Sequence, residues 1–143
     1  MGTWGAGIFE NDSAGDWLGL FDRLGFMAVT VPLSQIGEYS DRKKSIPADV
    51  EQAFLAMCEV VAIAGGSPAH PSLEGRKAGI QREAERMLKL PNFKRRILFA
   101  LERLEAQETE LEALWSGAEE SDTFRCERER AKQSALDALS RHE

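Results

Sequence analysis

Three carboxylate side chains stand near the start of the chain, at Glu10, Asp12 and Asp16. Asp12 and Asp16 are four residues apart and would share one face of a helix, an arrangement that can bind a divalent metal. No histidine lies near them in the sequence, and Asp12 is a good residue for capping a helix, so we favour a capping role. The alternative is a metal-dependent or small-molecule-processing enzyme that uses these carboxylates beside Trp4.

Three consecutive cations, Lys94, Arg95 and Arg96, fall in the first turn of a predicted helix. Positive charge opposes the helix dipole at that end, so the cluster could serve to bind an anion or an acidic partner. Ion pairing on a solvated surface is the commoner role, and we favour it. The acidic residues that could form such pairs are Glu83, Glu85 and Glu102.

The histidines and cysteines do not indicate catalysis. His70 lies in a predicted loop, and His142 is the penultimate residue. Two cysteines are too few for a zinc site, and Cys58 lies among apolar residues, as a small buried side chain would. No nucleophile can be paired with a base from these residues. We predict no catalytic residue, no metal ligand and no cofactor.

The N-terminal segment is rich in glycine and large apolar side chains. Gly2, Gly5 and Gly7 precede a helix, as glycines do in phosphate-binding loops. Their spacing fits no nucleotide-binding motif and no Lys-Ser or Lys-Thr pair follows, so we interpret them as turn residues. Trp4 and Phe9 are expected to hold the segment against the helices.

The chain has 143 residues, of which 43% are hydrophobic and 29% are charged, which is ordinary for one globular domain. Its net charge of −6 opposes binding to nucleic acid. The first ten residues carry no secretory signal, and the longest apolar run, Val60 to Ala64, is too short to span a membrane. We therefore expect a cytoplasmic protein that binds neither nucleic acid nor membrane.

Apolar residues recur every three or four positions through most of the chain, which predicts an all-α fold. We expect a single compact multi-helix bundle of about six to seven helices. An irregular Gly/Trp-rich segment (1–12) would pack on the helical body (13–143). The predicted helices are 13–24, 32–39, 47–64 and 76–88, then one capped by Asn92, one that follows Thr109 and one that opens at Ser121 or Asp122.

The helix at 47–64 is apolar nearly all round, so we expect it to be the core helix. Its expected N-cap is Ser45, and the candidates for capping the first helix are Asn11, Asp12 and Ser13. In the helix after Asn92, the expected inward stripe is Phe93, Ile97, Leu101 and Leu104, with support from Leu98 and Ala100.

The opening M-G-T-W-G-A-G-I-F-E-N-D-S-A-G-D-W-L resembles the signature of the bacterial domain-of-unknown-function 4259 family. The residues that carry the likeness are Trp4, Gly5, Gly7, Phe9, Asn11, Asp12, Ala14, Asp16 and Trp17. The segments 60–62 and 110–115 resemble the family's middle helix and its E-L-x-x-L-W element. The resemblance implies a helical, cytoplasmic bacterial protein, and it implies no activity and no catalytic residue.

We expect a non-enzymatic protein-interaction module. Its size, acidic charge and helical character are similar to those of the immunity proteins that neutralise secreted bacterial toxins. The enzyme based on the N-terminal carboxylates is one alternative. A structural homodimer, formed through apolar stripes that continue onto the surface, is another.

Overall fold

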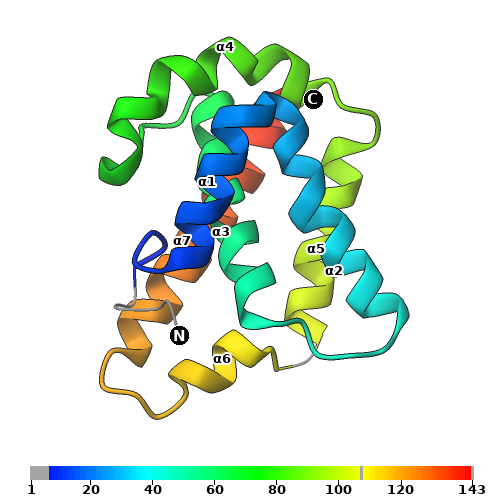
Figure 1. Ribbon diagram of the computed structural model, residues 1–143, viewed down its shortest axis with the longest axis vertical. Helices are drawn as coiled ribbons and strands as arrows, with labels where there is room; N and C mark the ends of the chain where they lie inside the picture. Colours follow the sequence, from blue (N-terminus) through cyan, green and yellow to red (C-terminus); the bar gives the residue numbers. More distant parts are fainter. Residues whose placement is uncertain (1–6, 107, 143) are drawn as a thin grey trace.

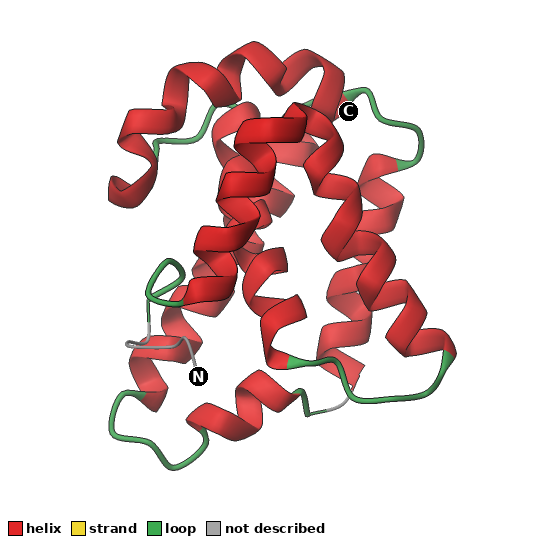
Figure 2. Cartoon of the chain, viewed as in Figure 1, coloured by secondary structure: helices red, strands yellow, loops and turns green. Residues whose placement is uncertain are grey.

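Figure 1 shows the computed structural model of the chain, which describes residues 7–106 and 108–142. These residues form α-helices and short 3-10 helices, with no strand among them (Figure 2). The elements are α1 (Asp12–Leu24), η1 (Gly25–Val29), α2 (Thr30–Asp41), α3 (Ala48–Ala64), η2 (Pro71–Arg76), α4 (Lys77–Leu88), α5 (Phe93–Ala106), α6 (Glu110–Trp115) and α7 (Ser121–Arg141). The all-α prediction is confirmed. None of the described helices has both the length and the apolar character that crossing a membrane requires.

The helices of the main body run in two opposite directions, and α4 and α6 lie across their ends. In the view of Figure 1, α1, α3 and α7 ascend, while α2 and α5 descend together on the right. α4 lies across the upper end of these helices and α6 across the lower end. α3 and α7 are parallel neighbours, because Arg128 contacts Glu51 near their N-terminal halves and Arg141 contacts Gly65 at their C-terminal ends.

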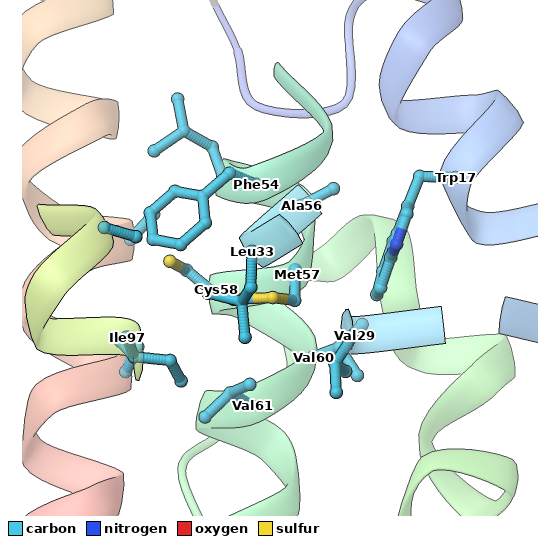
Figure 3. Close-up of a cluster of buried hydrophobic side chains, with 14 of the residues drawn as sticks. Trp17, Val29, Leu33, Phe54, Ala56, Met57, Cys58, Val60, Val61 and Ile97 are labelled. Atoms are coloured by element: carbon cyan, nitrogen blue, oxygen red, sulfur yellow. The ribbon is translucent and has the colours of Figure 1, made fainter. Parts of the chain in front are cut away.

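α3 lies at the centre of the core and is buried along almost its whole length, as predicted. Phe54, Met57 and Cys58 are fully buried. Figure 3 shows them among side chains of other elements, including Trp17 of α1, Leu33 of α2 and Ile97 of α5. Burial of a large apolar side chain contributes about 1.5–3 kcal/mol, so this cluster is the main source of stability.

The start of α3 differs from the prediction. Ser45 does not cap the helix, because Pro47 occupies the N-cap position. The N–H of Ala48 donates instead to Oε1 of Glu110, at 3.4 Å, and the N–H of Glu110 donates to the carbonyl of Ile46, at 3.3 Å. α6 therefore stabilises the start of α3 from 62 residues away in the sequence.

The C-terminal ends of α3 and α7 meet closely. Gly65 follows α3, and a Cβ at this position would clash with Ala138 of α7. Nε of Arg141 donates to the carbonyl of Gly65 at 3.3 Å, and Nε2 of His142 lies 3.2 Å from the same oxygen. The Arg141 cation thus stands at the negative end of the α3 dipole, where positive charge is favourable.

Candidate functional site

The structure does not bring the N-terminal carboxylates together. Glu10 turns back on its own loop, where its Oε1 accepts a hydrogen bond from the N–H of Gly7 at 3.1 Å. Asp12 is exposed in the first turn of α1. Asp16 is exposed beside a groove of about 270 Å³ between α1, α2 and α3. Trp4, the expected neighbour of these carboxylates, lies outside the described residues.

Asn11, and not Asp12, caps α1. Oδ1 of Asn11 accepts a hydrogen bond from the N–H of Ala14 at 2.7 Å, and its Nδ2 donates to the carbonyl of Ile8 at 3.1 Å. The capping role that we favoured for Asp12 is wrong, because Asn11 is the residue with extended backbone at the helix start. Asp12 is the first helical residue, and there the dipole favours its negative charge.

Other groups offer little chemistry. Within residues 7–106 and 108–142, no group of three or more His, Cys, Asp or Glu side chains could hold a metal ion. His70 packs edge-on against Phe9, and its Nδ1 accepts a hydrogen bond from the N–H of Ser72 at 3.1 Å, which stabilises the start of η2. Cys58 is buried, as predicted, and burial raises the pKa of its thiol, which keeps the group protonated.

The basic cluster of Lys94, Arg95 and Arg96 occupies the first turn of α5, as predicted. Arg96 reaches across to α2, where its NH2 donates to Oγ of Ser34 at 3.4 Å. Glu85, one of the expected acidic partners, forms an ion pair of 2.7 Å with the lysine four residues further along the chain. Arg95 is exposed. The cluster therefore helps to join α5 to α2 and also presents a cation at the surface.

α5 has an apolar outward surface that we did not predict. Leu98 is 43% exposed and Phe99 is 39% exposed. The prediction that Leu98 supports the inward stripe is wrong, because the buried stripe of α5 lies about 100° away around the helix, on the side of Ile97. The guanidinium of Arg103 lies over the Phe99 ring, 5.0 Å from its centroid. We name Arg95, Leu98, Phe99, Glu102 and Arg103 the α5 face. Glu102 is exposed, so the face carries one carboxylate beside its two guanidinium groups.

A basic hollow extends the α5 face towards the end of α2. It encloses about 180 Å³, and its lining includes Lys43, Lys44 and Arg103. Lys43 has a left-handed backbone, with φ of 56°, which costs a non-glycine residue about 1–2 kcal/mol. Cations therefore gather beside an exposed aromatic ring in a chain whose net charge is −6.

The contact between α3 and α7 contains buried charges that sequence reasoning missed. Glu51, Glu59, Arg128 and Lys132 are all buried. Nε of Arg128 donates to Oε2 of Glu51 at 2.7 Å, and NH2 of Arg130 lies 2.8 Å from Oε1 of Glu59. The two buried carboxylates of α3, Glu51 and Glu59, are thus each paired with an arginine of α7, so that neither buried charge is left alone. These ion pairs join α3 to α7.

Comparison with known proteins identifies the family of the chain but assigns it no activity. The family described as "Domain of unknown function (DUF4259)" matches residues 2–127. The chain belongs to this family. The DUF4259 match includes the N-terminal signature, α1 to α6 and the α5 face, and it ends one residue before Arg128. No curated protein and no solved structure matches the chain.

Proposed function

We propose that this DUF4259 protein is a non-enzymatic interaction module that binds a partner protein through the α5 face. The observation that carries the proposal is the exposed pair Leu98 and Phe99, on a helix that already buries a complete apolar stripe. Neither side chain is needed to fill the core, and both would gain free energy if a partner covered them. An aromatic ring beside an arginine is also the composition that dominates binding at protein interfaces.

The charges around the α5 face indicate the kind of partner. Arg95 and Arg103 flank Phe99 along α5, and Lys43 and Lys44 line the adjoining hollow. An acidic segment with one apolar side chain would complement this surface. The acidic remainder of the protein would repel the same segment, which restricts where it can dock.

The proposal includes a cellular setting and a finer role. The bacterial, cytoplasmic setting is supported by the family resemblance and by the two free cysteines, which suit a reducing compartment. Neutralisation of a toxin, as by immunity proteins, is a special case of the proposal. It requires that the partner be an enzyme whose activity falls when the α5 face binds it.

The test uses the double variant Leu98→Ser/Phe99→Ser. A partner is captured from the native cell with the unmodified protein, purified and titrated against each variant. We expect the affinity for an acidic partner to be at least about tenfold lower in the double variant. For the unmodified protein, the affinity should fall as the salt concentration rises. Leu114→Ser is the matched control, because Leu114 of α6 is equally exposed, and it should bind normally.

Two outcomes would contradict the proposal. One is a partner that binds the double variant as tightly as the unmodified protein. The other is a homodimer, detected by sedimentation at rising protein concentration, that dissociates in the double variant. That result would assign the α5 face to a second copy of this chain and not to an acidic partner.

A further inference from the structure

A second candidate site lies between α5, α6 and α7, in a pocket of about 300 Å³. Its charged lining residues are Glu105, Glu108, Glu112, Arg128, Glu129 and Lys132. Glu105 is two residues beyond Arg103, which places it roughly 160° around α5 from that residue. The pocket is therefore separate from the hollow that extends the α5 face.

Lys132 is the residue that suggests a ligand. Its side chain is buried, at 3% exposure, yet its Nζ has no hydrogen-bond partner in the part of the chain that the structure describes. The carboxylate paired with it belongs to Glu129, whose Oε1 lies 3.7 Å away, too far for a hydrogen bond. An ammonium group has three N–H donors, and burying them without acceptors is costly. An oxygen ligand in the pocket would remove that cost.

Glu129 marks where such a ligand would bind. Its side chain is 66% exposed, so it can turn aside into water. A ligand carboxylate that replaced it could approach Nζ of Lys132 to hydrogen-bond distance. Arg128 lies at the same side of the pocket as a second cation, although it is already held by Glu51 at 2.7 Å and by Glu112 at 3.6 Å. The inner part of the pocket therefore favours a carboxylate.

The outer part of the pocket has the opposite charge. Glu105, near the end of α5, and Glu108, in the segment before α6, are exposed and line the pocket. A ligand with only negative charge would be repelled by these two carboxylates, and a simple amine would be repelled by Lys132. A ligand that carries both a carboxylate and an ammonium group would interact favourably with both parts. The volume lies at the lower end of the range for small-molecule pockets.

We infer that this pocket binds a small zwitterion of amino-acid size, with its carboxylate at Lys132 and its ammonium group at Glu105 and Glu108. The inference goes beyond the proposed partner binding, because it concerns a different surface and a different class of ligand. A failure of one proposal therefore leaves the other unaffected.

The first experiment titrates the full chain with glycine, L-alanine and L-leucine, followed by NMR. Each amino acid is compared with its methyl ester, which lacks the carboxylate, and its N-acetyl derivative, which lacks the ammonium group. We expect at least one amino acid to bind, and both of its derivatives to bind at least about tenfold more weakly. The inference is overturned if no amino acid binds at millimolar concentration, or if an N-acetyl derivative binds as tightly as its parent.

Variants then locate the binding. Lys132→Met should abolish it, whereas Lys77→Met, at an exposed position of α4, should leave it unchanged. Glu129→Gln removes the competing carboxylate and should tighten binding. Glu105→Gln/Glu108→Gln should weaken binding of the amino acid but not of its N-acetyl derivative. These glutamates are exposed, so they test the inference even if Lys132→Met fails to fold. Unchanged binding in every variant would refute the site.

Discussion

The α3–α7 contact and the α5 face reverse the usual distribution of side chains. The first buries Glu51 and Glu59 against arginines, and the second exposes Leu98 and Phe99 to solvent. The buried carboxylates have partners on the neighbouring helix, so their role is to specify how two helices fit. The exposed apolar side chains fill no place in the core, and we propose that they bind a partner. The two regions should therefore respond to mutation in opposite ways.

The largest effect is expected at the buried pair. Arg128→Met leaves the carboxylate of Glu51 buried without its partner, which should lower the free energy of unfolding by about 3–5 kcal/mol. Urea unfolding followed by circular dichroism measures the loss. The double variant Glu51→Leu/Arg128→Met removes both charges and should recover most of the stability. If it is as unstable as the single variant, the pair is not what holds this contact.

A smaller loss is expected where α3 and α7 approach most closely. Gly65→Ala introduces a Cβ that clashes with Ala138, and such overpacking should cost about 1–3 kcal/mol in a urea melt. Gly15→Ala is the matched control, because a Cβ at that helical position meets no atom within 4 Å. It should stabilise the protein by about 0.5–1 kcal/mol. Equal effects at both glycines would show that the helix ends are not tightly packed.

The N-terminal cap should give a still smaller change. Asn11→Ala removes the hydrogen bond to the N–H of Ala14 and should cost about 1 kcal/mol of unfolding free energy. Asp12→Ala removes only a favourable charge near the helix end, worth about 0.3–1 kcal/mol, and that loss should shrink as salt is added. Thermal melts at low and high salt distinguish the two. A larger loss for Asp12→Ala would restore the capping role first expected of it.

The smallest change in stability is expected at the α5 face. Leu98→Ser/Phe99→Ser should shift the free energy of unfolding by no more than about 0.5 kcal/mol per site, because both side chains are already partly in water. The same variant should lose partner binding. A strong loss of stability would mean that these residues support the fold, and the contrast with the α3–α7 contact would fail.

Local signals in the sequence predicted much of the fold. Thr109 was expected to open a helix, and its Oγ1 accepts a hydrogen bond from the N–H of Glu112 at 3.1 Å. The helix predicted at 47–64 was expected to end at residue 64, and α3 ends there, with Gly65 as its C-cap. Such signals depend on residues a few positions apart, which a single sequence displays directly.

Long-range contacts could not be predicted in the same way. Glu51 stands 77 residues from Arg128, so nothing near the glutamate in sequence indicates its partner. One signal was available: Glu51 and Glu59 interrupt a helix that is otherwise apolar on nearly every side. The outward position of Leu98 was missed because the apolar pattern of α5 is wider than the stripe that its neighbours cover. The candidate pocket depends on three helices and was not predicted at all.

The parallel pairing of α3 and α7 has a consequence for how the chain folds. Two parallel neighbours cannot be joined by a short turn, and in this chain η2, α4, α5 and α6 lie between α3 and α7 in sequence. Contacts between residues so far apart in sequence form slowly. During synthesis from the N-terminus, α3 emerges well before the arginines that pair with its glutamates. We therefore expect α3 to remain partly hydrated until α7 has been synthesised and can complete the core.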